Sequence, residues 1–274
     1  NDPPVVTDIP DQTRAEGTLF STISLDNYVS DADNTDAQIT WTSSGSSQLT
    51  VSIVNRVATI TVPDVNWNGS ETITFTATDP EGSSNSDAAT FTVTPVNDAP
   101  VVGDIPNQTI AEGGTFATIA LDDYVSDVDN SDAQMTWTWT GNTNLTVSIT
   151  DRVASITTPG PEWSGAETVT FRATDPAGLF SSNAAVFTVT AVNDPPVVTD
   201  IPDQTIEEGS SFVTIPLDIY VSDVDHTDAQ MVWTYSGNSQ LTVSIAARVA
   251  TITIPNINWF GSETIVFTAT DPGS

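Results

Sequence analysis

Apolar and polar side chains alternate along most of this chain, which is the pattern of β-strands with one buried face. Ile73, Phe75 and Ala77 share one face of such a strand, and threonines occupy the positions between them. No stretch shows the period of an amphipathic helix. In the first hundred residues the alternation predicts seven strands, at residues 5–6 continuing at 12–14, 19–25, 38–43, 49–53, 57–62, 72–78 and 88–94.

The strands are short and are separated by turns rich in Gly, Pro, Asp and Asn. Seven such strands predict an immunoglobulin-like, Greek-key β-sandwich, and a tryptophan on the third strand is typical of that fold. The sequence places a tryptophan there in each of three segments, at Trp41, Trp137 and Trp233. We therefore expect an all-β protein built from seven-stranded sandwiches.

The whole pattern recurs every 96 residues. Asn-Asp-Pro-Pro at position 1 returns as Asn-Asp-Ala-Pro at 97 and Asn-Asp-Pro-Pro at 193. A period of this length matches one small domain and exceeds the period of solenoid repeats. We expect three sandwiches arranged end to end, residues 1–96, 97–192 and 193–274. The third has no counterpart of the last strand, residues 88–94 and 184–190, so it is either shortened or completed by another chain.

Composition narrows the function. The 274 residues carry 36 acidic side chains against five basic ones, all arginine, and the formal charge is −31. This charge excludes nucleic acid and anionic membrane surfaces as partners, because both require a basic surface. There is no cysteine, and the single histidine does not recur, so the usual nucleophile and general-base pairs are missing. We expect a non-catalytic, extracellular or cell-surface segment.

Strand direction predicts where the acidic loops lie. Successive strands alternate in direction, so Glu16 and Glu71 fall at one end of the first sandwich and Asp31, Asp33 and Asp79 at the other. The linker Asn97-Asp98 leads from the first end to the acidic end of the next sandwich, which adds Asp127, Asp129 and Asp175. Like charges about 4 Å apart repel by about 4 kcal/mol at an effective dielectric near 20. A cation must therefore balance this cluster, and an all-oxygen ligand set favours Ca²⁺.

The sequence Val96-Asn97-Asp98-Ala99-Pro100 and the recurring acidic loops resemble bacterial cadherin-like tandem repeats. Both the dystroglycan-type cadherin-like repeats and the "VNDAP" repeats of large surface proteins are similar over all three units. The resemblance implies that Glu16, Glu71, the pair Asp127 and Asp129, and Asp175 hold calcium at a junction between repeats. Pro95 and Ala99 depart from the family's linker, so we expect one or two ions per junction instead of three.

The 96-residue period extends this ligand set to every repeat. The candidate calcium ligands are Glu16, Asp31, Asp33, Glu71, Asp79, Asn97, Asp98, Glu112, Asp127, Asp129, Glu167, Asp175, Asn193, Asp194, Glu208, Asp223, Asp225 and Asp271. Together they predict a calcium-stiffened spacer or adhesive stalk. The alternative is a module that binds carbohydrate or assembles into filaments. The candidate partners are neighbouring repeats, other copies of the chain through homotypic contacts or a donated strand, and surface glycans.

Three structural alternatives stay open. Asp31, Asp33 and Asp36 could only form Asx turns, in which side chains accept bonds from nearby backbone N–H groups. Glu71 could be a solvated charge at a strand edge. Trp67, Trp163 and Trp259 either stack on sugars or close the end of each core. The arginines Arg56, Arg152 and Arg248, at the hairpin between the fourth and fifth predicted strands of each repeat, are expected to pair with neighbouring carboxylates.

Overall fold

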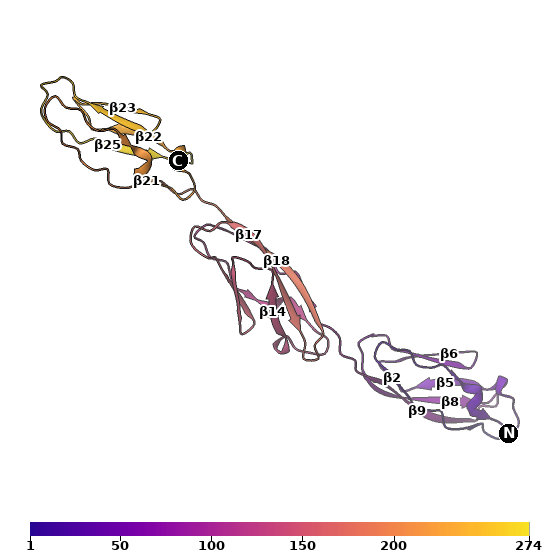
Figure 1. Ribbon diagram of the computed structural model, residues 1–274. Coiled ribbons are helices and arrows are strands. Elements are labelled where there is room, and N and C mark those ends of the chain that lie inside the picture. The colour runs from indigo at the N-terminus through magenta and orange to yellow at the C-terminus, as the bar shows by residue number, and fades with distance from the viewer. Residues whose placement is uncertain (274) are drawn as a thin grey trace. The chain divides into compact units, whose positions relative to one another are not determined.

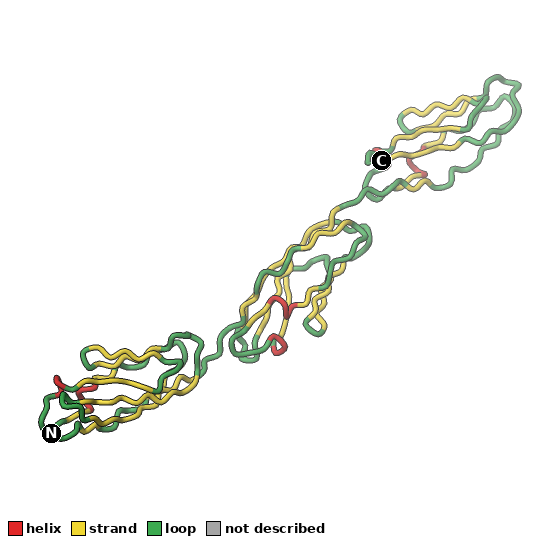
Figure 2. Tube along the Cα trace, turned by 180° about the vertical axis from the view of Figure 1, so that it is seen from behind, coloured by secondary structure: helices red, strands yellow, loops and turns green. Residues whose placement is uncertain are grey.

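The computed structural model describes residues 1–273. Strands form nearly all of the regular structure, and short 3-10 turns are the only helical elements among these residues (Figures 1 and 2). Two compact units arise from the contacts: residues 1–103, 124–137 and 172–182 form the first, and residues 104–123, 138–171 and those from 183 onward form the second. The expected all-β, immunoglobulin-like class is confirmed.

In the first repeat, β2, β9, β8 and β5 form a four-stranded sheet, and β3, β7 and β6 form a three-stranded one. β2 runs parallel to β9, whereas the pairs β3-β7, β5-β8, β6-β7 and β8-β9 are antiparallel. The short strands β1 and β4 pair with each other. The elements are β1 (Val5–Val6), β2 (Gln12–Ala15), β3 (Ile23–Ser24), η1 (Leu25–Tyr28), β4 (Val29–Ser30), η2 (Asp36–Gln38), β5 (Thr40–Ser44), β6 (Thr50–Val54), β7 (Val57–Thr61), β8 (Gly69–Thr78) and β9 (Ser84–Thr94).

The second repeat has the same strand order, with sheets β11-β18-β17-β14 and β12-β16-β15 and the pair β10-β13. β11 and β18 again run parallel. Its elements are β10 (Val101–Val102), β11 (Gln108–Ala111), β12 (Ile119–Ala120), η3 (Leu121–Tyr124), β13 (Val125–Ser126), η4 (Asp132–Gln134), β14 (Thr136–Thr140), β15 (Thr146–Thr150), β16 (Val153–Thr157), β17 (Gly165–Thr174) and β18 (Phe180–Thr190).

The third repeat keeps the sheet β20-β24-β23 and the pair β19-β21, but β25 pairs with β22 alone within the described residues. β25 has five residues, whereas β8 and β17 have ten, so pairing on one side supports a shorter strand. The elements are β19 (Val197–Val198), β20 (Ile215–Pro216), η5 (Leu217–Tyr220), β21 (Val221–Ser222), η6 (Asp228–Gln230), β22 (Val232–Ser236), β23 (Thr242–Ala246), β24 (Val249–Thr253) and β25 (Val266–Thr270).

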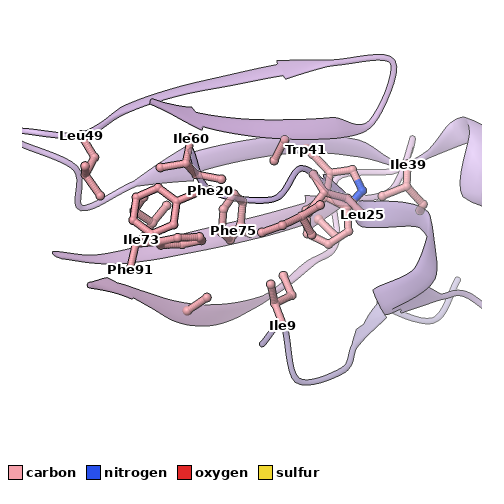
Figure 3. Packing of buried hydrophobic residues seen from close by; sticks show 14 of the residues in the cluster. Ile9, Phe20, Leu25, Ile39, Trp41, Leu49, Ile60, Ile73, Phe75 and Phe91 are labelled. Atoms are coloured by element: carbon pink, nitrogen blue, oxygen red, sulfur yellow. The ribbon is translucent and has the colours of Figure 1, made fainter. Parts of the chain in front are cut away.

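The core of the first repeat lies between its two sheets. Phe75 and Phe91 are fully buried, and Phe20 meets Phe91 edge to face with ring centroids 5.3 Å apart (Figure 3). Trp41, on β5, packs in the same cluster. Phe116 and Phe187 repeat this ring contact at the same separation in the second repeat. The alternation along β8 therefore does what the sequence predicts, since its apolar residues form the core.

The second predicted strand, residues 19–25, is mostly wrong. Only Ile23–Ser24 forms a strand, and Leu25–Tyr28 turns into a 3-10 helix. The Gln12 side chain accepts a hydrogen bond from the Ser21 N–H and donates one to the Ser21 carbonyl. A side chain thus replaces the strand ladder there, and Gln108 and Gln204 do the same at Ala117 and Val213.

The third predicted strand begins later than expected, at Thr40. Residues Asp36–Gln38 form a 3-10 turn in which the Thr35 and Gln38 side chains cap one another's backbone N–H groups. A Ser/Thr followed three residues later by Gln is a known start signal for a helical turn. The same arrangement occurs at Ser131 and Gln134 and at Thr227 and Gln230.

The hairpin between β6 and β7 turns through Asn55 and Arg56, whose φ angles are 51° and 61°. Two positive φ angles are the signature of the tight turn that matches strand twist. Arg56 Nε donates to the Asp26 carboxylate at 2.8 Å, and Arg152 and Arg248 pair with Asp122 and Asp218 at 2.8 and 2.9 Å. The predicted pairing of these arginines with carboxylates is confirmed.

Candidate functional site

One end of each repeat gathers acidic side chains around a tight loop. In the second repeat, Asp127 Oδ1 accepts hydrogen bonds from the backbone N–H groups of Asp129 and Asn130, both at 2.9 Å. Asp31 and Asp223 form the same two bonds in their own loops. The Asx-turn geometry is therefore present, and it uses one oxygen of each carboxylate.

The second oxygen of each of these carboxylates does not take part in the Asx turn. Asp31 Oδ2, Asp127 Oδ2 and Asp223 Oδ2 are buried and accept no hydrogen bond from the described residues. A buried charged oxygen without a donor is costly, because it has lost water and gained nothing in return. A bound cation removes that cost. This observation fits a metal at the same place in all three repeats.

A second aspartate lies at the same end and is nearly inaccessible to solvent. Asp175 is 5% exposed, and its Oδ1 accepts from the N–H groups of Gly178 and Leu179 at 2.6 and 2.9 Å. Burial acts to raise the pKa of Asp175, but hydrogen bonds from Asn97 and from the backbone outweigh it and lower the pKa. Asp79 and Asp271 are each 4% exposed. A hydrogen bond from the Asn1 side chain lowers the pKa of Asp79 below its ordinary value.

The linker residues join this acidic end directly. Asn97 Nδ2 donates to Asp175 Oδ2 at 2.7 Å, and the Asp98 N–H donates to Asp129 Oδ2 at 2.7 Å. Asn193 and Asp194 make the same bonds to Asp271 and Asp225. The structure therefore brings together the predicted linker, loop and strand-end residues of each of these sets.

The glutamates at the opposite end contact the residue that precedes each linker motif. Glu16 Oε2 accepts from the Val96 N–H at 3.1 Å, and Glu112 Oε2 accepts from the Val192 N–H at 3.0 Å. Glu16 Oε1 is buried and accepts no bond from the described residues. Glu208, the third member by period, is exposed. Glu16 thus adds a further oxygen that suits a cation beside the linker.

Glu71 and Glu167 have a different environment from that expected. Glu71 lies on β8, and its two carboxylate oxygens accept the backbone N–H groups of Ser47, Gln48 and Leu49. Glu167 holds residues 143–145 in the same way. Glu263, which sequence reasoning missed, does so for residues 239–241. These glutamates organise the loops before β6, β15 and β23, and their oxygens are occupied by backbone N–H groups instead of being directed to the linker.

These bonds give Glu71 a measurable signature. Burial acts to raise its pKa, but the Ser47 hydroxyl and three backbone donors outweigh it and lower the pKa to about 2. The native state is thus favoured above the ordinary pKa of about 4.3 in the unfolded chain. That contribution is lost as the pH falls from there through about 2.

We expect Glu71→Gln to destabilise the first repeat by about 1.5–3 kcal/mol at pH 7, because hydrogen bonds to charged groups contribute about this much. The difference from the parent protein should shrink between about pH 4.5 and pH 2. Urea unfolding at a series of pH values measures both. Asp8→Asn, in an exposed loop of the same repeat, is the control. Equal stabilities of Glu71→Gln and the parent at pH 7 would contradict this role.

A further acidic residue near the second linker was also missed. The pKa of Glu162 is raised, first by a hydrogen bond with Asp194 and then by the charge of Asp194, with smaller effects from burial and from Glu112 and Asp225. A carboxyl group with a raised pKa beside like charges indicates a concentration of negative charge there. The only sequence signal was its position beside Trp163.

The tryptophans of the loop before β8, β17 and β25 are half-buried. Trp67 packs against the core of its repeat, and Trp259 Nε1 donates to Gln240 Oε1 at 2.7 Å. Both contacts support the interpretation that these tryptophans close the end of the sandwich core. Binding of sugars by these rings stays a prediction.

Comparison with known proteins identifies the repeat type. The family model described as "Bacterial Ig domain" matches residues 1–94, 97–190 and 193–274. No curated protein is similar in sequence to this chain. No helix among residues 1–273 has the length and apolar character needed to cross a membrane.

Solved structures of cadherin domains share the fold at low sequence identity. Protocadherin gamma B2 domains 1–5 are 14% identical, with a TM-score of 0.52, over 99% of this chain and 60% of that chain. The protocadherin gamma B4 extracellular domain is 15% identical, with a TM-score of 0.53, over 98% and 47%. Mouse cadherin-23 domains 22–24 are 18% identical, with a TM-score of 0.51, over 100% and 95%. The chain spans about half to three fifths of the first two structures.

Proposed function

The chain belongs to the bacterial Ig domain family, and on that premise we propose that it is a calcium-stiffened spacer or adhesive segment of a secreted or surface protein. Domains of this family are typically non-catalytic and are typical of surface and secreted proteins. The shared fold of cadherin repeats supports a structural or adhesive role. Calcium is the finer part of the proposal and rests on the acidic ends of the repeats.

Three buried oxygens that accept no hydrogen bond from the described residues carry the proposal: Asp31 Oδ2, Asp127 Oδ2 and Asp223 Oδ2. They recur at one position in three repeats, beside a second buried aspartate and a linker asparagine. Calcium takes six to eight oxygen ligands in flexible geometry, whereas magnesium requires a tighter octahedron and keeps more of its water. Carboxylate and amide oxygens are the donors on hand, and they suit calcium.

Calcium would stiffen the linker because it binds one linker conformation and stabilises that conformation relative to the others. The Val96 N–H is held by Glu16, while Asn97 and Asp98 are bonded to Asp175 and Asp129. An ion would be held by carboxylates on both sides of these three residues. It would therefore stabilise only the linker conformation in which those carboxylates lie close together. Binding would therefore convert a flexible connection into a stiffer one.

Small-angle scattering tests this function. With millimolar calcium, we expect a narrow distribution of interatomic distances with a defined maximum. A calcium chelator should broaden that distribution, and added calcium should restore it. Magnesium at the same concentration is the control. Identical profiles with calcium and with chelator would contradict the proposal.

Assembly through the third repeat is the second candidate. A groove beside β25 is lined by core-type residues that include Phe212, Ile215, Leu241, Trp259 and Phe267. A strand in which apolar and polar residues alternate as in β9 or β18 would fit this groove, since unpaired strand edges accept added strands. The same scattering data give the molecular mass. A mass of two or more chains would support assembly by this edge, and a single-chain mass at all concentrations would contradict it.

A further inference from the structure

The acidic end of the third repeat differs from the other two by one side chain. Position 226 is histidine, whereas the equivalent residues are Asn34 and Asn130. The loop itself is unchanged: the His226 N–H donates to Asp223 Oδ1 at 2.7 Å, as the Asn34 and Asn130 N–H groups do to Asp31 and Asp127. The substitution thus replaces an amide by an imidazole without altering the backbone.

The two side chains behave differently at this position. Asn130 Nδ2 donates to Asn97 Oδ1 and Asp127 Oδ1, both at 3.3 Å. His226 Nδ1 lies 3.4 Å from Asp223 Oδ1 but is buried and makes no hydrogen bond within the described residues. His226 therefore places an imidazole nitrogen at this position, and this nitrogen does not make the hydrogen bonds that Asn130 makes.

The groups around His226 are suitable metal ligands. One ligand atom each from Asp223, His226 and Asp271 lie within 4.8 Å of one another. The Asp223 side chain is 0% exposed, and its Oδ2 is buried and accepts no hydrogen bond from the described residues. The Asp271 residue is 4% exposed. A buried carboxylate oxygen and a buried imidazole nitrogen that both lack hydrogen bonds within the described residues are an independent indication of a ligand.

We propose that the acidic end of the third repeat is a zinc site, with His226, Asp223 and Asp271 as its ligands. This inference deepens the proposed function, because it gives one of the cation sites a different metal preference. Zinc binds imidazole and carboxylate at about 2.0–2.2 Å, which places tetrahedral ligand atoms about 3.3–3.6 Å apart. One ligand atom each of Asp223, His226 and Asp271 lie within 4.8 Å of one another, so modest side-chain movements bring them to that spacing.

The neighbouring repeats explain why the preference is local. An imidazole suits zinc, whereas carboxylate, carbonyl and water oxygens suit calcium. The first two repeats offer an amide at this position, so their ligand sets remain entirely oxygen. The chain would therefore hold two kinds of cation site, with zinc confined to the end that carries its single histidine.

Zinc titration of the whole chain by calorimetry tests the inference. We expect one zinc site in the parent protein, and His226→Asn should weaken it by tenfold or more, because even an outer-shell partner of a metal ligand contributes that much. His226→Asn copies the residue of the other two repeats, so the loop is expected to fold. Asn130→His should create a second zinc site. Undiminished zinc affinity in His226→Asn would overturn the inference.

Nuclear magnetic resonance adds a readout that depends on this side chain alone. The chain has one histidine, so its imidazole nitrogen signals are assigned without ambiguity. Zinc should shift them strongly, and calcium at the same concentration should shift them far less. Imidazole signals that do not move with zinc would overturn the inference. Calcium binding without zinc at His226 would overturn this inference alone, and zinc binding without calcium anywhere would overturn the calcium function alone.

Discussion

Replacing Asp127 and Asp129 together with Asn should abolish calcium binding at the acidic end of the second repeat. The number of calcium ions bound per chain should fall by the number that this end holds. Asp127→Asn removes the buried anionic oxygen but keeps an amide oxygen for the N–H groups of Asp129 and Asn130. The loop should therefore fold without its metal. Calcium calorimetry with the parent and variant proteins measures the loss.

A matched control separates this loss from a general change of charge. Asp123 and Asp132 belong to the same repeat, are exposed and lie in its two 3-10 turns. Asp123→Asn with Asp132→Asn also removes two charges, and calcium binding should stay unchanged. The site built on Asp31 and Asp33 should keep its calcium in both variants. Loss at every site, or at none, would contradict the assignment of the acidic loop to one end.

Phe75→Ala should have the largest effect on stability, about 3–5 kcal/mol for the first repeat. Phe75 is fully buried between the sheets and packs edge to face with Phe91, with ring centroids 6.4 Å apart. Removing the ring leaves a cavity that the surrounding strands fill only in part. Urea unfolding followed by circular dichroism should show one transition moved to lower urea.

Phe267 is the matched comparison, because it holds the equivalent position on β25 and is only half-buried. Phe267→Ala should destabilise its repeat by markedly less than Phe75→Ala destabilises the first. The reason is that solvent already reaches one side of the ring, so truncation removes less buried surface. Equal effects would contradict the description of the third repeat as a sandwich with an open side.

The sandwich was predictable because its core depends on alternation alone. Ile73, Phe75 and Ala77 alternate with threonines, and this pattern leaves one choice of buried face. The segment 19–25 has the same apparent alternation, but hydrogen bonds from the Gln12 side chain occupy the Ser21 backbone. Such a bond between a side chain and a distant backbone group leaves no periodic signal.

The acidic ends were predictable from the direction of the strands, since loop position depends on topology and not on side-chain detail. Asn97, Asp98, Asp129 and Asp175 meet as expected. Glu71 does not join them because a strand residue faces whatever loop crosses its side of the sheet, here residues 47–49. Its spacing in the sequence is compatible with both roles, and only the three backbone donors distinguish them.

Calcium bound to the purified chain at equilibrium tests the central claim most directly, with the unfolding temperature followed on the same samples. We expect calcium at the ends that carry Asp31 and Asp127, at dissociation constants of about 10⁻⁴–10⁻³ M as in other extracellular modules. At 10 mM calcium each site should then stabilise the native state by about 1.4–2.7 kcal/mol. No bound calcium at this concentration, with the same unfolding temperature in calcium and in chelator, would contradict the account.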